Sequence, residues 1–357
     1  MTVRRLFFAL AALAASVAGA APGLAQGDAK SSPQDKSSPQ DKPSVLEQIQ
    51  KRGALVCGIA VAPGFAQQNE TGEWRGFDAD YCRALASAIF DDPGKVRFLP
   101  LGPKERVVAL QAGWVDLLAG GAPWTLARDA GQRLLYAVAT FYDGQGFLLR
   151  AKQAAASAQD WSKLAVCVQQ GTSLELDLGD FFQARQADHP PRLFASFDEA
   201  LSAYDAGQCD VLSADVSTLH AARAKLAQPA EHVVAPELIS KAPHGPIVRQ
   251  GDDQWFNIVR WTQFAMVDAE EFGLSSANVD TALKSENPGV RRLLGVEGDH
   301  GEGLGLAADW AYRIVKHVGN YGEAFERNLG QGSPLAMERR LNALWTKGGL
   351  MYAPPVR

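Results

Sequence analysis

The 357-residue sequence lacks a surplus of basic residues: 35 Lys and Arg stand against 40 Asp and Glu, which gives a net charge of −5. A protein that neutralises a phosphate backbone needs the opposite balance, so the charge argues against nucleic acid as a partner. Cysteine is scarce as well, and four residues are too few for a fold held mainly by disulfides. Hydrophobic residues make up 46% and charged residues 21%, so the chain can bury a core and is neither collagen-like nor wholly disordered.

Long hydrophobic runs are also lacking, apart from one at the N-terminus. There, Arg4 and Arg5 precede an uncharged apolar stretch over residues 6–18, and small residues follow up to residue 25. The stretch is shorter than the ~20 residues that span a bilayer, so it predicts a cleaved secretory signal peptide over residues 1–25 and not a membrane anchor. Because the first cysteine, Cys57, lies far beyond this segment, we expect a periplasmic protein that is not a lipoprotein.

Residues 26–43 contain little that could pack into a core. The hexapeptide Ser-Ser-Pro-Gln-Asp-Lys occurs at 31–36 and again at 37–42, without an apolar residue. This composition is typical of a disordered, solvated tether, and the repeat is better explained as a duplicated spacer than as a functional unit. Ordered structure is expected from Ser44, whose side chain can cap a short helix that Gly53 ends.

From residue 54, short apolar strands alternate with helices in two similar cycles. The expected strands are residues 54–59, 96–99 and 115–118 in the first cycle and 164–168 and 209–212 in the second. The expected helices start at residue 76, span 104–112, and in the second cycle span 176–182 and 197–206. Strands joined through helices form parallel sheets, so the sequence predicts two α/β lobes.

Two segments can cross between the lobes. Residues 142–150 are glycine-rich and then apolar, and residues 241–249 contain prolines and a glycine that exclude a helix. We therefore expect lobe one at 44–147, lobe two at 148–245, and a return to lobe one with a C-terminal helical extension at 246–357.

The four cysteines fall as one pair in each predicted lobe, Cys57 with Cys82 and Cys167 with Cys209. Three pairings are possible, and only pairing within lobes leaves the connection between them free to move. Four buried free thiols are the alternative, and export to an oxidising compartment argues against it. The spacings are long and histidines do not cluster beside the cysteines, so no metal site is expected.

Two lobes on a movable connection imply a cleft, and in open α/β sheets ligands bind at the carboxyl ends of the strands. In lobe one this edge carries Gly121, where the backbone can approach a ligand, and Arg128, whose forked donors can take a carboxylate. In lobe two it carries Thr172 and Ser173, at a helix start that can accept an anion, and Asp215, which can bind an ammonium group. Each residue could instead be an ordinary helix cap or a solvated surface residue.

Several longer segments carry a family resemblance; they are residues 76–83, 104–106, 143–147, 203–210, 250–256, 318–323 and 352–357. In these segments the chain resembles the periplasmic solute-binding proteins of polar amino-acid ABC transporters, specifically the general L-amino-acid-binding type, over essentially all of residues 44–357. The resemblance implies two α/β lobes joined by two crossing strands, with a small-molecule ligand, an L-amino acid or an analogue, clamped between them. It also implies an ABC permease in the inner membrane as partner. We further expect a monomer without a cofactor, and no catalysis, because the cleft segments contain no Ser-His-Asp order, HExxH motif, Walker loop or close carboxylate pair.

The resemblance also implies roles for individual residues. In the family an arginine, here Arg128, binds the α-carboxylate, and an aspartate of lobe two, here Asp215, binds the α-ammonium. A Gly-Thr-Thr segment, here Gly171, Thr172 and Ser173, donates amide and hydroxyl groups to the carboxylate. Further positions are an aromatic that packs on the ligand, a tryptophan beside the site and an arginine that reaches polar ligand side chains; these are Phe65, Trp124 and Arg106.

One segment departs from the family pattern. Before Trp124 the family usually has a hydroxyl-rich run that gives both a backbone N–H and a hydroxyl to the carboxylate, whereas this chain has Gly121, Ala122 and Pro123. Proline has no N–H and alanine has no hydroxyl, so at least two donors are missing. The departure leaves open a ligand that is not an amino acid. A sensory subunit and a dehydratase-like enzyme are the remaining alternatives.

Overall fold

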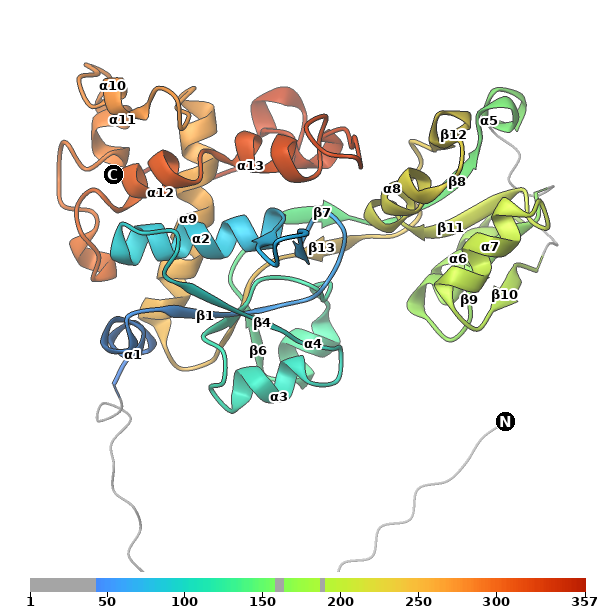
Figure 1. Cartoon of the computed structure of the whole chain (residues 1–357), viewed down its shortest axis with the longest axis horizontal. Helices are drawn as coiled ribbons and strands as arrows, with labels where there is room; N and C mark the ends of the chain where they lie inside the picture. Colours follow the sequence, from blue (N-terminus) through green and yellow to red (C-terminus); the bar gives the residue numbers. More distant parts are fainter. Residues whose placement is uncertain (1–42, 158–163, 187–189) are drawn as a thin grey trace, which may run out of the picture. The chain divides into compact units, whose positions relative to one another are not determined.

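The computed structural model describes residues 43–157, 164–186 and 190–357 (Figure 1). The predicted signal peptide and all but the last residue of the predicted tether lie outside these residues. Within them, no helix is both long and apolar enough to cross a membrane. The chain starts with α1 (Val45–Arg52), which has a capping box formed by Ser44 and Glu47 and ends at Gly53 in the left-handed conformation, as expected.

Lobe one is built on a five-stranded sheet with the order β4-β1-β5-β14-β6. Its strands are β1 (Leu55–Ile59), β4 (Val96–Pro100), β5 (Leu117–Leu118), β6 (Leu134–Tyr136) and β14 (Ile247–Arg249). β1 is parallel to β4 and β5, and the crossovers pass through α2 (Phe77–Phe90) and α3 (Arg106–Gln111). A short hairpin, β2 (Gln67–Gln68) with β3 (Trp74–Arg75), precedes α2, and α4 (Leu126–Gly131) follows β5.

Lobe two is built on a second five-stranded sheet with the order β10-β9-β11-β8-β12. Its strands are β8 (Gln145–Arg150), β9 (Val166–Gln169), β10 (Arg192–Phe194), β11 (Val211–Asp215) and β12 (His232–Val234). β9 is parallel to β10 and β11, and β8 runs antiparallel to both of its neighbours, β11 and β12. The helices of this lobe are α5 (Ala151–Ser157), α6 (Ser173–Ala184), α7 (Phe197–Asp205) and α8 (Val216–Lys225), with the 3-10 turn η3 (Pro229–Glu231).

Two antiparallel strands, β7 (Phe141–Asp143) and β13 (Ala242–His244), form the hinge between the lobes (Figure 1). β7 continues into β8, and β13 leads into β14. Because β8 and β14 run antiparallel to their neighbours, each five-stranded sheet is mixed. Gln145, the first residue of β8, pairs with Asp215, the last residue of β11. Ile247, the first residue of β14, likewise pairs with Leu118 at the end of β5. The carboxyl ends of both sets of parallel strands therefore adjoin the hinge.

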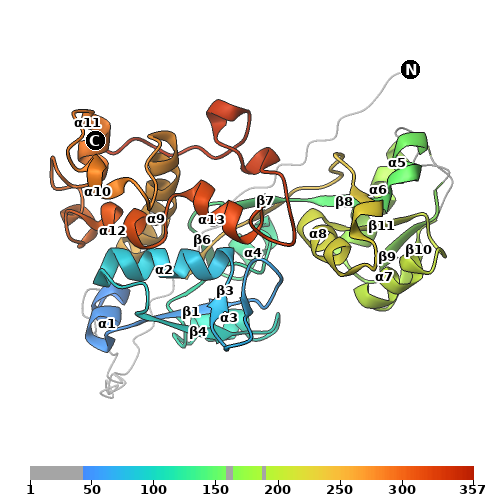
Figure 2. The ribbon, with the colours of Figure 1, turned by 45° about the horizontal axis from the view of Figure 1, so that its top comes forward.

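C-terminal helices cover lobe one, as the sequence predicts (Figures 1 and 2). They are α9 (Asp253–Glu271), α10 (Val279–Ala282), α11 (Pro288–Leu293), α12 (Trp310–His317) and α13 (Tyr321–Asn328), with short 3-10 turns at Glu302–Leu304, Arg340–Asn342 and Trp345–Lys347. α12 packs on α2 and α9, and the expected apolar positions Trp310 and Ile314 are buried. These helices extend the core of lobe one far beyond its sheet.

The cysteines form two disulfides, and each lies within one lobe. Cys57 in β1 joins Cys82 in α2, and Cys167 in β9 joins Cys209 just before β11. The pairing predicted from the sequence is thus confirmed, and neither bond crosses the hinge.

Candidate ligand-binding cleft

Arg128 lies in the first turn of α4, in the loop and helix that follow β5. The side chain of Thr125 caps this helix by accepting a hydrogen bond from the backbone N–H of Arg128 at 3.4 Å. The guanidinium of Arg128 is half-buried and donates from Nη1 to the carbonyl of Pro123 at 2.8 Å. Because a guanidinium carries five donors in a fixed fork, this one bond holds its orientation without using its capacity to bind a carboxylate.

Arg106 and Gly121 lie beside Arg128. The Arg106 guanidinium donates to the carbonyls of Gly121 and Leu101. Burial and the nearby charge of Arg128 lower the pKa of Arg106, so the two cations are close enough to affect each other. Gly121 has φ +83°, and a Cβ there would collide with Ala60 and Arg106, so only glycine fits. The structure therefore brings Arg106, Gly121 and Arg128 together.

Three polar residues that the sequence reasoning missed complete this side of the cleft. Asp78, in the first turn of α2, is buried, and burial raises its pKa to about 7 against the opposing charge of Arg106. The Tyr136 hydroxyl donates to the Pro123 carbonyl at 3.1 Å. Burial, with the charges of Arg128 and Arg106, lowers the pKa of His244 to about 4, so that its imidazole is neutral. Two guanidinium groups of lobe one thus lie near a neutral histidine of the hinge strand β13.

Trp124 fixes the loop to the hinge. Its backbone N–H donates to the Pro243 carbonyl in β13 at 2.7 Å, and its indole N–H donates to Asp129 at 3.2 Å. Its ring stacks on Tyr136, with the ring centroids 5.2 Å apart and the planes within 6°. These contacts couple the position of the loop before Arg128 to one of the two hinge strands.

Phe65 lies on the loop between β1 and β2 and is half-buried. It packs edge-to-face on Phe141 of β7, with the ring centroids 5.1 Å apart. It also lines a cavity of about 190 Å³ whose opposite wall is formed by α7 and α8 of lobe two, including Phe197 and Ser217. Phe65 therefore faces lobe two across a space near the hinge, which is where an aromatic could pack on a ligand.

Asp215 ends β11 and immediately precedes α8, but its side chain does not cap that helix. Burial, and next the charges of Asp143 and Asp177, raise the pKa of Asp215 to about 7. Asp143, at the end of hinge strand β7, accepts hydrogen bonds from the backbone N–H groups of Gly144 and Ser217 and from the Ser217 hydroxyl. Burial raises the pKa of Asp143 as well. Asp177 and Asp215 of lobe two and Asp143 of the hinge thus form a group of mutually repelling carboxyl groups, which favours a cation there.

Thr172 and Ser173 lie at the start of α6, as predicted, at the same edge of the lobe-two sheet as Asp215. The Thr172 hydroxyl donates to the Gln169 carbonyl at 2.9 Å, and the backbone N–H of Gly171 donates to the Glu175 side chain at 2.7 Å. In this arrangement those two donors serve the loop itself, and a ligand carboxylate would have to replace the Glu175 carboxylate to receive the Gly171 N–H.

The predicted site residues therefore fall into two groups, one on each lobe. Among the residues that the structure describes, no hydrogen bond or ion pair joins Arg128 to Asp215. Both groups nevertheless lie at strand ends that adjoin the hinge, so rotation about β7 and β13 would bring them toward one ligand.

A two-lobed α/β fold with a two-stranded hinge, a cationic edge on one lobe and an acidic edge on the other defines a solute-binding protein that takes its ligand between the lobes. The chain belongs to the bacterial extracellular solute-binding proteins, family 3, whose family model matches residues 55–273. The solved structure of an ABC transporter/periplasmic binding protein from Brucella ovis with glutathione bound is 50% identical, with a TM-score of 0.79, and covers 88% of this chain and 100% of that one.

Two curated relatives are similar over nearly their whole length. The general L-amino acid-binding periplasmic protein AapJ of Rhizobium johnstonii is 49% identical over 317 residues, which cover 88% of this chain and 93% of the relative. The glutamate/glutamine/aspartate/asparagine-binding protein BztA of Rhodobacter capsulatus is 42% identical over 353 residues, which cover 98% of each chain. These comparisons confirm the family and the fold that the sequence predicts, and the relatives carry the names of binding proteins and not of enzymes.

Proposed function

We propose that this protein is the periplasmic receptor of an ABC importer and that it closes on a small amino acid or related zwitterion, which it delivers to the permease. The observation that carries the proposal is the charge asymmetry of the cleft, with Arg106 and Arg128 on lobe one and the carboxyl groups of Asp215 on lobe two and Asp143 on the adjoining hinge strand. A zwitterion matches that asymmetry with its own two charges. The names of AapJ and BztA and the glutathione bound to the Brucella ovis protein support the same class of ligand.

In this proposal each predicted residue has a defined part. Arg128 binds the α-carboxylate through its remaining donors, and Asp215 binds the α-ammonium. Thr172 and Ser173 add donors from lobe two, and Phe65 packs on the apolar part of the ligand. Three more residues shape the pocket of lobe one: Arg106, which favours a ligand with a second carboxylate, Gly121, which admits the ligand to the backbone, and Trp124, which holds the loop.

The proposal extends to the organisation of the chain. Residues 1–25 serve as the export signal, 26–43 as a tether, 44–147 and 246–357 as lobe one, and 148–245 as lobe two. The receptor is a monomer without a cofactor, and incubation with prephenate or arogenate is expected to leave both compounds unchanged, in contrast to a dehydratase. A thermal-shift screen of L-amino acids, glutathione and small organic acids tests the ligand class, because a bound ligand raises the melting temperature by mass action.

A second candidate is the same receptor with a ligand that is not an amino acid. The observation that favours it is the proline at position 123, which has neither an N–H nor a hydroxyl to donate to a carboxylate. The Pro123→Thr variant regains an N–H and a hydroxyl while keeping the carbonyl that holds Arg128 and Tyr136. If an α-carboxylate is the natural anion, calorimetry should show about tenfold tighter binding of L-glutamate, the effect of one hydrogen bond of ~1.4 kcal/mol.

Pro100→Thr, at the exposed end of β4, is a matched control that should not change the affinity. Unchanged or weaker binding by Pro123→Thr, with the fold intact, would favour the second candidate.

Binding of a zwitterion is expected to weaken below about pH 7, because only the ionised form of Asp215 attracts an ammonium group and the pKa of Asp215 is raised to about 7. Well below that pKa, one proton must leave Asp215 for each ligand bound, so the affinity for L-glutamate should fall about tenfold per pH unit. Calorimetry from about pH 8 down to about pH 5 measures the slope. Asp215→Asn should bind weakly with little pH dependence, and an equally steep slope in that variant would assign the titration to another group.

A further inference from the structure

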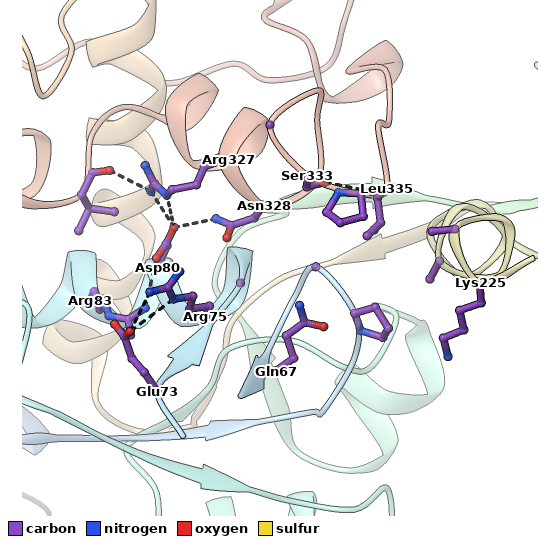
Figure 3. Close-up of a pocket in the computed structure, with 18 of the residues that line it drawn as sticks. Gln67, Glu73, Arg75, Asp80, Arg83, Lys225, Arg327, Asn328, Ser333 and Leu335 are labelled. Carbon is purple, nitrogen blue, oxygen red and sulfur yellow. Dashed lines mark hydrogen bonds and ion pairs between the residues drawn. The ribbon is translucent and has the colours of Figure 1, made fainter. Parts of the chain in front are cut away.

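Residues 329–342, which we call the C-terminal strap, connect lobe one, lobe two and the hinge. They follow α13 and lie outside the segment matched by the family model, which ends at residue 273. In Figure 3 this segment passes above the part of the chain that carries Gln67, the first residue of β2, with α8 and Lys225 to one side. The strap is therefore an addition to the two-lobed fold and contacts both of its parts.

The strap contacts lobe two through α8. The carbonyl of Leu335, a buried residue, accepts hydrogen bonds from Nδ1 of His220 at 3.0 Å and from Nη2 of Arg223 at 3.2 Å. Burial lowers the pKa of His220 to about 4, so its imidazole is neutral and donates from Nδ1. Further along, the Arg340 guanidinium donates to the carbonyl of Pro236, which follows β12.

The strap is fixed to lobe one and to the hinge at its other end. Arg339 forms a two-pronged ion pair with Glu270 of α9, with N–O distances of 3.1 and 3.0 Å, and both side chains are largely buried. The Asn342 side chain accepts from the backbone N–H of Tyr142 at 2.7 Å and donates to its carbonyl at 3.0 Å. Tyr142 is the middle residue of β7, so this part of the strap is attached to a hinge strand.

The backbone of the strap is strained. Ala336 and Arg340 both have φ +46°, in the left-handed region that residues with a Cβ disfavour. Such conformations persist only where surrounding contacts impose them, and they cluster in segments that switch. Here they flank the buried Met337 and lie between the contact to α8 and the contact to the hinge.

Beside the strap there is room for α8 to move. A cavity of about 690 Å³ has walls from the strap (Ser333 to Leu335), from α8 (Ala221 and Lys225) and from the loop around Gly64 (Figure 3). On its lobe-one side the wall is rigid, because Asp80 accepts from Arg327 and Asn328 and pairs with Arg83. A cavity with one rigid wall and one wall on the other lobe changes its volume when the lobes rotate.

We propose that the C-terminal strap stabilises the arrangement of the lobes in this structure, in which no hydrogen bond or ion pair among the described residues joins Arg128 to Asp215; we call this the separated state. The strap must release or shift α8 when the lobes close on a ligand, so it lowers the apparent ligand affinity. The inference rests on the proposed function, in which closure brings Arg128 and Asp215 onto one ligand. Since the strap is anchored to α9 and β7, it cannot follow α8 as lobe two rotates. Contacts that stabilise the separated state reduce the closed fraction, and the apparent dissociation constant rises in inverse proportion to that fraction.

The test removes the two donors to Leu335 in the double variant His220→Ala, Arg223→Met. The matched control is Arg185→Met, which removes a cation of lobe two whose partner Glu237, at 3.0 Å, belongs to the same lobe. Spin labels at Ala130→Cys in α4 and Asp180→Cys in α6 report the distance between the lobes, since both residues are exposed and the native cysteines are in disulfides.

Without ligand, the double variant should shift the label distances toward shorter values, and the control should not. Its affinity for L-glutamate or glutathione should be about tenfold tighter, equivalent to ~1.4 kcal/mol. Arg340→Ala should shift both readouts in the same direction. Label distances equal to those of the control, or weaker binding by a folded double variant, would overturn the proposal. The ligand-free distances test the strap even if neither compound binds, so its failure can be told apart from that of the proposed function.

Discussion

Replacement of Arg128 by alanine should lower the affinity for any α-amino acid by roughly 10²- to 10⁴-fold. The proposed role of the guanidinium is to bind the α-carboxylate, and a forked pair of hydrogen bonds to a carboxylate is worth ~1.5 to 3 kcal/mol for each bond. Its hydrogen bond to the Pro123 carbonyl orients the guanidinium and leaves other N–H donors for a carboxylate. Isothermal calorimetry with L-glutamate and glutathione measures the loss.

Two further variants separate the binding role of Arg128 from a structural one. Arg97→Ala removes an exposed arginine from β4 of the same lobe and should leave the affinity unchanged. Arg128→Lys keeps the positive charge but lacks the two parallel N–H donors of the guanidinium. Its affinity should therefore lie between those of Arg128→Ala and the unchanged protein. The carboxylate assignment would be wrong if Arg128→Ala, with an unchanged melting temperature, still bound amino acids at micromolar concentrations.

The alternation of strands and helices was enough to predict the two lobes, because each buried strand is a short apolar run bounded by turn residues. The strands expected at 54–59, 96–99 and 164–168 all lie within one or two residues of β1, β4 and β9. The antiparallel members of the sheets were not predicted. β8 and β14 are the ends of the crossing segments, and their direction follows from the hinge and not from any local pattern.

The positions of the candidate site residues were predictable where a residue lies at a strand end or at the following helix start. Arg128 and Asp215 both fit that description, and the structure places each at a sheet edge beside the hinge. Tyr136 and His244 do not fit it. They lie on β6 and β13, and only the pairing of β14 with β6 and of β13 with β7 brings them to Arg128.

Pro123 shows which properties of one residue can be predicted from sequence and which cannot. That it is a proline means that it has no backbone N–H, which is a property of the residue type alone. Its carbonyl, by contrast, accepts from Arg128 and Tyr136, and that depends on how the loop folds. The sequence therefore predicts what Pro123 cannot donate, and the structure adds that the same residue orients Arg128, the arginine proposed to bind the carboxylate.

Removal of the lobe-two disulfide, by Cys167→Ser with Cys209→Ser, should lower the free energy of unfolding by about 4 kcal/mol. The bond closes a sequence separation of 42 residues, against 25 for Cys57–Cys82, and the loop-entropy estimate rises with that length to ~4 and ~3.5 kcal/mol, respectively. Urea unfolding measures the total loss. Because the hinge carries no disulfide, the loss should be confined to lobe two, where hydrogen exchange in β9 and β11 should accelerate while that in β1 and α2 stays slow.

The position of this bond links stability to binding. It ties β9, which leads to Thr172 and Ser173, to the start of β11, which ends at Asp215. Loosening that pair should separate the lobe-two residues that are proposed to bind the ligand, so the double serine variant should also bind L-glutamate more weakly. The corresponding Cys57→Ser, Cys82→Ser variant is the control, and equal acceleration of exchange in both lobes would show that the lobes do not unfold independently. If they do unfold independently, the ligand binds between two separately stable units. Its apparent affinity then includes the free energy of closing the lobes about the hinge.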